Sequence, residues 1–178
     1  MADETKKKQN NIALTVIIVA GIVLIAAALS AATIVMLNNN SQDKKIFTAS
    51  YLASEVVRKM NYENLSELSP SDIPNYYEIP EGTITDSAMF ISSRPDSYTE
   101  IACFKLNGKD KEKALTETIG KYISAKKKNY QNVNEKAYEV VSAGKTDVHY
   151  PYVFVAISSD SEAAISTFEA IVSTEEQS

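Results

Sequence analysis

The chain has 178 residues and a formal net charge of −5, with 18 basic and 23 acidic side chains. An acidic balance without a clustered basic face disfavours nucleic acid as a partner. The only cysteine is Cys103, which excludes an intrachain disulfide, so packing alone must stabilise the fold.

Residues 12–37 contain no charged side chain and follow the lysine cluster Lys6–Lys8. About 20 apolar residues suffice to cross the hydrocarbon core of a bilayer, so we expect a transmembrane helix in contact with lipid here. Lysines in front of a first span keep the amino terminus in the cytoplasm. We therefore expect a single-pass protein of the cell membrane with its C-terminal domain outside. Its expected parts are a cytoplasmic tail (1–11), the span (12–37), a spacer (38–45), an extracytoplasmic domain (46–174) and a flexible tail (175–178).

A cleaved signal peptide is the alternative for this segment. Residues 28–31, Ala-Leu-Ser-Ala, have the small side chains of a cleavage site. The apolar run continues past them to Leu37, however, and cleavage would leave an apolar new terminus. An uncleaved anchor is the prediction, and cleavage stays open.

The first part of the outer domain is predicted to be a helix followed by a loop. Apolar residues recur at helical spacing between Asp43 and Met60. Residues 61–83 contain three of the five prolines and no clear period, which indicates an ordered loop. Four of its side chains are too apolar for a solvated linker and are expected to pack onto the domain: Ile73, Tyr76, Tyr77 and Ile79.

Two hairpins and two helices are predicted in the rest of the domain. The first hairpin has strands at 87–92 and 98–106 with a turn at Pro95-Asp96, and a helix follows at 111–128. The second hairpin has strands at 138–143 and 150–157 with a turn near 144–147, and residues 158–160 begin the last helix.

The expected fold class is therefore α+β. It is a single domain with a four-stranded, mainly antiparallel sheet and the order helix, hairpin, helix, hairpin, helix. Residues 101–106 and 150–157 are apolar at nearly every position. Such strands are covered on both faces, so these two are predicted at the centre of the sheet.

Short motifs in the domain resemble a known family. Ala102-Cys103-Phe104-Lys105 is similar to the "alanine, apolar, phenylalanine, lysine" strand of a bacterial domain of unknown function, found in small lipoproteins and single-anchor membrane proteins. Tyr76-Tyr77-Glu78-Ile79 resembles its Tyr-Tyr-Gly-Ile element, with Glu78 in place of glycine. His149-Tyr150-Pro151-Tyr152 stands where members carry a glycine-tyrosine pair. The resemblance spans about 47–172 and implies an exported, tethered domain without assigning catalytic residues.

No catalytic, cofactor or metal site is expected from the titratable residues. His149 is the only histidine, and a zinc or copper site needs three or four suitable ligands. Cys103 lies among apolar neighbours, where a thiol behaves as a small hydrophobic group. Acidic residues at the predicted helix starts complement the helix dipole: Asp110, Glu112, Asp160 and Glu162. Lys126–Lys128 match the dipole at the end of the middle helix, and a binding patch for an anionic partner is the alternative for them.

Ten tyrosines without a tryptophan are the unusual feature of the composition. Tyrosine has a large apolar face and a polar tip, which suits recognition surfaces. Tyr76 and Tyr77 are the candidate partner-binding residues, and packing at the edge of the core is the alternative for both. If the chain is extended there, adjacent side chains alternate, and one of the two tyrosines stays at the surface.

The function expected from these features is non-catalytic. We expect a membrane-tethered extracytoplasmic domain that binds a protein or a cell-envelope component, without a cofactor. The alternative is an envelope enzyme that uses carboxylates which the sequence does not identify.

Overall fold

A computed structural model describes residues 47–174, which belong to the unit Lys45–Ser178. The predicted tail at 1–11, transmembrane helix at 12–37, spacer at 38–45 and C-terminal tail at 175–178 lie outside the described residues. Within residues 47–174, no helix combines the length and the apolar character that a membrane span requires.

The centre of the domain is a five-stranded sheet in which every neighbouring pair is antiparallel. Its order is β1-β2-β3-β5-β4. β3 (Glu100–Leu106) is the middle strand, and β5 (Tyr152–Ile157) lies beside it. Both are buried at every position except Lys105, which confirms the prediction that these two strands are covered on both faces. The strands are β1 (Leu65–Glu67), β2 (Ile84–Ser92), β3 (Glu100–Leu106), β4 (Lys145–His149) and β5 (Tyr152–Ile157).

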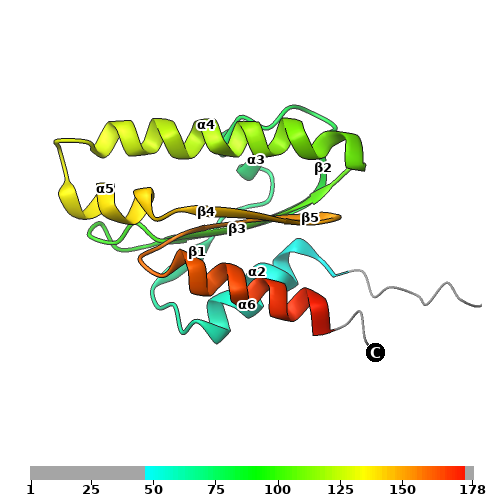
Figure 1. Ribbon diagram of the computed structural model, residues 1–178, viewed down its shortest axis with the longest axis horizontal. Coiled ribbons are helices and arrows are strands. Elements are labelled where there is room, and N and C mark those ends of the chain that lie inside the picture. Colours follow the sequence, from blue (N-terminus) through cyan, green and yellow to red (C-terminus); the bar gives the residue numbers. More distant parts are fainter. Residues whose placement is uncertain (1–46, 175–178) are drawn as a thin grey trace, which may run out of the picture. The chain divides into compact units, whose positions relative to one another are not determined.

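Helices cover both faces of this sheet (Figure 1). One face carries α2 (Ala49–Lys59) and α6 (Ser161–Thr174). The other carries α3 (Ile73–Tyr77), α4 (Glu112–Tyr130) and α5 (Glu135–Ser142), and a short 3₁₀ turn at Lys109–Lys111 leads into α4.

Strand alternation divides the core between the two faces. Successive strand side chains point to opposite sides of a sheet. In β3, Ile101 and Cys103 therefore join the core under α2 and α6, whereas Ala102 and Phe104 join the core under α4. We call these the α2–α6 face and the α4 face.

The start of α2 is fixed to the sheet by side chains of two strands. The Ala49 N–H donates a 2.7 Å hydrogen bond to an Asp86 carboxylate oxygen. The Tyr152 hydroxyl donates to the Phe47 carbonyl at 2.8 Å. Because the first N–H groups of a helix have no partner within the helix, the Asp86 contact satisfies one of them and anchors α2 where the described chain begins.

The predicted strand at 138–143 is wrong, because residues 138–142 belong to α5 and Ala143 caps its end. The Asn134 side chain accepts a hydrogen bond from the Ala137 N–H at 3.0 Å and caps the helix. Ala137 and Val141 are both buried, one helical turn apart. The strand follows as β4, where a turn was expected, and the hairpin turns instead at Tyr150-Pro151, whose peptide bond is cis.

The predicted loop at 61–83 contains two short elements, β1 and α3, and the sheet has five strands rather than the expected four. β1 is an edge strand of three residues, too short to give a period in the sequence. The predicted packing of this segment onto the domain is confirmed for Ile73, Tyr77 and Ile79, which are buried.

Candidate functional site

The two tyrosines predicted as partner-binding residues line a pocket between α3 and α4. The pocket has a volume of about 430 Å³, which lies within the range of small-ligand sites. Its lining residues are Tyr76, Tyr77, Glu78, Pro80, Thr118, Lys121, Tyr122 and Ala125. We call it the tyrosine pocket.

The single turn of helix α3 separates the directions of the two tyrosines. Pro74 lies in its first turn, and the Ile79 N–H donates to the Pro74 carbonyl at 2.8 Å beyond its end. Side chains of neighbouring helical residues diverge by about 100°. Tyr77 is therefore buried, whereas 41% of Tyr76 is exposed. One tyrosine lies at the surface, but the expected extended backbone is wrong, because residues 73–77 are helical and the helix separates the two rings.

Aromatic side chains that line the pocket pack against one another and against the core. The Tyr77 ring lies 4.3 Å from the Tyr122 ring and 5.2 Å from the Phe104 ring, centroid to centroid. The Tyr76 ring lies 5.7 Å from Tyr122 at an angle of 50°. Tilted and edge-to-face arrangements such as these are favourable for aromatic pairs. Tyr76 is thus an exposed ring that packs against the partly buried Tyr122, which in turn contacts the buried Tyr77.

A buried ion pair lies next to this wall. Glu100 is only 4% exposed, and its carboxylate contacts the Lys126 ammonium group. The Tyr122 hydroxyl donates to Glu100 at 2.8 Å, and the Lys126 ammonium donates to the Tyr122 hydroxyl at 3.1 Å. The ammonium nitrogen also lies 5.3 Å from the centre of the Tyr122 ring. Each group therefore compensates the desolvation of another, as a buried charge requires.

Burial shifts the titration of these side chains. It lowers the pKa of Lys126 to about 8, while the Glu100 carboxylate in contact with the ammonium opposes this shift. Burial and then the neighbouring Tyr77 hydroxyl raise the pKa of Tyr122. Burial also raises the pKa of Tyr77. Both phenols therefore remain protonated, and each can donate a hydrogen bond.

The Tyr77 hydroxyl is buried and has no hydrogen-bond partner within residues 47–174. A buried polar group without a partner costs about 1–3 kcal/mol of stability. Among the described residues, this hydroxyl is the one buried side-chain polar atom without a hydrogen-bond partner, and it belongs to a residue that lines the pocket.

Sequence reasoning missed three residues of this site: Glu100, Tyr122 and Lys126. Two features of the sequence pointed to these residues. Glu100 is a charged residue at the start of β3, followed by the uncharged residues 101–104 before Lys105 and Leu106 end the strand. Lys126 continues the stripe of Leu115, Ile119 and Tyr122 at helical spacing, which points it inward. The sequence places it with Lys127 and Lys128 at the end of the helix, where lysines complement the helix dipole, but α4 continues to Tyr130.

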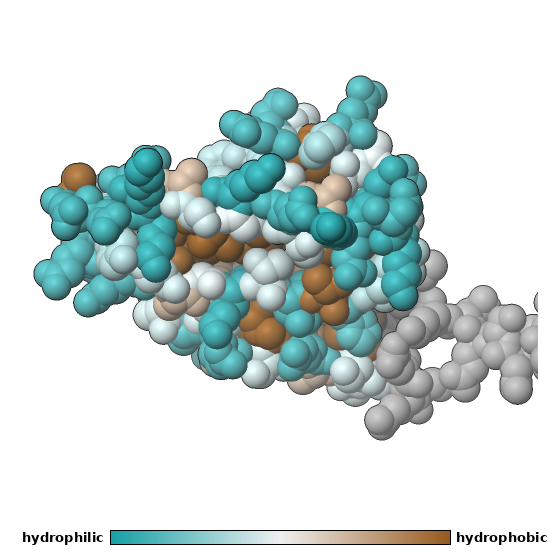
Figure 2. All heavy atoms as spheres, turned by 45° about the horizontal axis from the view of Figure 1, so that its top comes forward, coloured by the Kyte–Doolittle hydropathy of each residue, from teal (hydrophilic) through white to brown (hydrophobic). Residues whose placement is uncertain are grey.

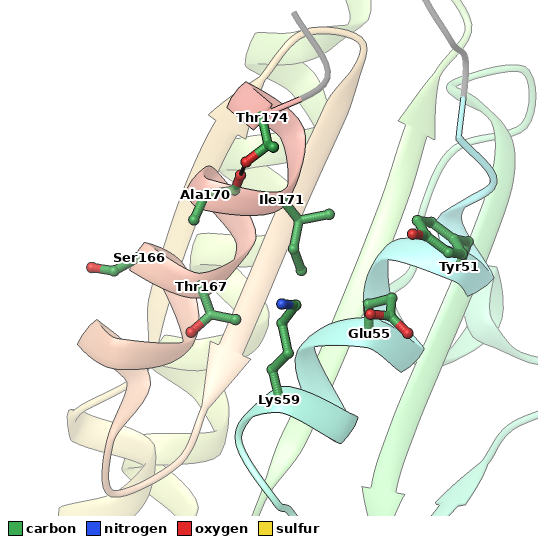
Figure 3. A pocket seen from close by; sticks show the side chains of 8 residues that line it. All are labelled: Tyr51, Glu55, Lys59, Ser166, Thr167, Ala170, Ile171 and Thr174. Carbon is green, nitrogen blue, oxygen red and sulfur yellow. Dashed lines mark hydrogen bonds between the residues drawn. The ribbon is translucent and has the colours of Figure 1, made fainter. Parts of the chain in front are cut away.

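A second hollow is the groove between α2 and α6, with a volume of about 600 Å³ (Figure 3). Its lining side chains come from both helices, and Lys59 extends between them. Glu55 already pairs with Arg58 at 2.7 Å. The α6 side presents small and hydroxyl side chains together with Ile171. The groove is open and mixed in character, without a buried charge in its lining.

The other residues that the sequence singled out have structural surroundings. Cys103 is buried, and burial raises the pKa of its thiol, as expected for a small hydrophobic group. His149 ends β4 and is partly buried. Asp110 pairs with Lys111 at 3.0 Å, and Glu162 pairs with Lys145 at 3.1 Å. Across residues 47–174, no three histidine, cysteine, aspartate or glutamate side chains gather as a metal site would require.

Comparison with known proteins identifies the family. Residues 58–158 match the domain of unknown function DUF4358, and the chain belongs to this family. The matched segment includes the whole sheet and the tyrosine pocket. No curated protein and no solved structure matches the chain.

Proposed function

We propose that this member of the DUF4358 family is a membrane-tethered, extracytoplasmic domain of the bacterial cell envelope. It binds a protein or an envelope component through the tyrosine pocket and catalyses no reaction. The observation that carries the proposal is the exposed ring of Tyr76, which is held by Tyr122 at the mouth of the pocket.

An aromatic side chain on a rigid base is a favourable contact for a partner. Tyrosine supplies a large contact area and loses little conformational entropy on binding, and such residues often dominate interface energies. The surface on the side of α4 is otherwise mostly hydrophilic, and hydrophobic residues show mainly in hollows between polar side chains (Figure 2). A partner that binds here would therefore gain most from the few aromatic positions.

The lining of the hollows supports binding rather than catalysis. Hydrolysis of envelope polymers such as glycans commonly uses two carboxylates that face one another across the scissile bond. The tyrosine pocket contains only Glu78, the α2–α6 groove only Glu55, and the hollow along residues 131–138 only Glu135. A binding role does not need a pair of carboxylates, so it is compatible with the lining of these three hollows.

The membrane tether is supported by the uncharged residues 12–37 and by the preceding Lys6–Lys8. Protease added outside intact protoplasts should digest the domain and leave a short anchored fragment. Protection of the domain until the membrane is opened would contradict the proposed orientation. The mass of the mature protein tests cleavage, because an uncleaved anchor retains residues 1–37.

Chemical crosslinking in native membranes followed by capture of the full chain tests the binding site. The Tyr76→Ala variant should lose the captured partner and keep its melting temperature, because Tyr76 is 41% exposed. Tyr150→Ala is the matched control, since Tyr150 is 46% exposed in the turn between β4 and β5. Equal capture by the two variants would contradict the proposed site.

A further inference from the structure

We infer that the tyrosine pocket binds a ring of a neutral saccharide, an inference that rests on the proposed function and names its ligand class. The pocket lies between α3 and α4 and is lined by three tyrosines, one acidic residue and one lysine. The buried hydroxyl of one of these tyrosines, Tyr77, has no partner within residues 47–174.

The aromatic lining matches the apolar face of a sugar ring. The face of a tyrosine ring is electron-rich, and it attracts groups that carry a partial positive charge. The C–H groups on one side of a pyranose ring are such groups. The Tyr76 and Tyr122 rings, whose centroids lie 5.7 Å apart and whose planes are tilted by 50°, form two adjoining walls for a ring of this kind.

The charges of the pocket favour a neutral ligand. Glu78 and Lys121, which have opposite charges, both line it. The ion pair between Glu100 and Lys126 is also balanced. An anion would meet Glu78, and a cation would meet Lys121. A cation would in addition compete with the Lys126 ammonium, which already lies 5.3 Å from the Tyr122 ring centre.

The polar groups of the pocket match a ligand that is rich in hydroxyls. Thr118 and the tyrosines can donate and accept hydrogen bonds, Lys121 donates, and Glu78 accepts. A sugar hydroxyl also does both. The buried Tyr77 hydroxyl has no partner within residues 47–174, so a ligand hydroxyl that reached it would satisfy a bond that the fold leaves open.

Titration calorimetry on the full chain, kept in a detergent without a sugar headgroup, tests this inference. The probes are N-acetylglucosamine, its neutral β-1,4-linked tetramer, a galacturonate tetramer of equal length, and choline. We expect the neutral tetramer to bind and the acidic tetramer and choline not to bind. Binding of the tetramer but not of the monosaccharide would identify a polymer as the source, and binding of both would identify a single ring.

Variants of the pocket sharpen this test. Tyr76→Ala should weaken binding of the neutral tetramer by about tenfold or more. Tyr77→Phe should weaken it by a smaller factor without a loss of stability, which a purely structural tyrosine would not show. Tyr150→Ala should leave the affinity unchanged. Binding of the charged probes in preference to the neutral one, or equal affinities of all variants, would overturn the inference.

The saccharide inference and the proposed function fail in different ways. If Tyr76→Ala abolishes capture of a membrane partner but no neutral saccharide binds, the ligand class is wrong and the binding role of the pocket stands. If Tyr76→Ala changes neither capture nor saccharide binding, both the inference and the proposed site are wrong.

Discussion

The two faces of the sheet differ in what they bury. On the α2–α6 face, Phe154 stacks on Phe168 at 4.5 Å, and the Tyr152 hydroxyl donates to a backbone carbonyl. On the α4 face, the buried Glu100 pairs with Lys126, which is largely buried, and the Tyr77 hydroxyl has no partner within residues 47–174. Both faces thus contain polar atoms, and the partly buried Asp86 carboxylate brings a charge to the first. Among the described residues, only the second contains a largely buried ion pair and a buried hydroxyl without a partner.

This difference separates packing from function. A buried ion pair contributes little net stability compared with apolar side chains of similar size. A buried hydroxyl without a hydrogen-bond partner lowers the free energy of unfolding. Folding alone does not require either feature, and both adjoin the tyrosine pocket. The α4 face is therefore where we place binding, and the α2–α6 face is where we expect side chains to act through stability alone.

The largest effect that tests this comparison is expected from the ion pair. Lys126→Met leaves the Glu100 carboxylate buried without its counter-ion and should lower the free energy of unfolding by about 3–5 kcal/mol. Glu100→Gln in the same chain should restore much of the loss, because the two sites are coupled. Urea denaturation measures both, with the exposed Lys128→Met as control. A loss no larger than that of Lys128→Met would contradict the account.

A matched pair of hydroxyl deletions compares the faces directly. Tyr152→Phe on the α2–α6 face removes a 2.8 Å hydrogen bond to Phe47 and should cost about 1–2 kcal/mol. Tyr77→Phe on the α4 face removes a hydroxyl without a partner and should be neutral or stabilising. Thermal and urea unfolding of the two variants provide the measurement. Equal losses would mean that Tyr77 has a partner in solution.

Two experiments on Cys103 test whether side chains of the α2–α6 face act through stability alone. Cys103→Ser should cost about 1 kcal/mol, because a hydroxyl replaces a buried thiol, and should leave partner capture unchanged.

Burial raises the pKa of Cys103, so the native thiol should resist alkylation near pH 9, where an unfolded thiol is largely ionised and reacts. Because the unfolded state loses this proton first, stability should fall as the pH rises above that range. Rapid alkylation of the native protein would contradict the burial.

The smallest effect concerns the end of α3. Glu78 has φ 56° and ψ 42°, a left-handed conformation that costs an ordinary side chain about 1–2 kcal/mol. Glu78→Gly should therefore stabilise the domain by about 0.5–1 kcal/mol, since the greater freedom of glycine in the unfolded chain offsets part of the gain. The melting temperature measures this change. A decrease would show that the Glu78 side chain makes a stabilising contact at the rim of the pocket.

The sequence predicted those parts of the fold whose pattern reflects burial on one or both sides. The central strands and the long helices α4 and α6 have such patterns. β1 and β4 lack a burial pattern, because they are short edge strands whose side chains are all partly or fully exposed. Residues 138–143 have β-favouring side chains, but capping by Asn134 and the burial of Ala137 and Val141 favour the helix.

The candidate site was predicted only in part, for a different reason. Tyr76 and Tyr77 stood out because aromatic residues are unexpected in a loop. Glu100 and Lys126 are 26 positions apart and meet only because β3 and α4 pack together, so no local pattern could pair them. The family resemblance does add one physical detail. A glycine would suit the left-handed backbone at Glu78, as in the Tyr-Tyr-Gly-Ile element that residues 76–79 resemble.

Photo-crosslinking from position 76 is the most direct test of the central claim that the tyrosine pocket is the binding surface. A benzophenone-bearing residue would replace Tyr76 in one full-length chain and Tyr150 in another, and both would be irradiated in native membranes. The account predicts a discrete adduct from position 76 and none from position 150, although the two tyrosines are similarly exposed. No adduct from position 76, or the same adducts from both positions, would contradict it.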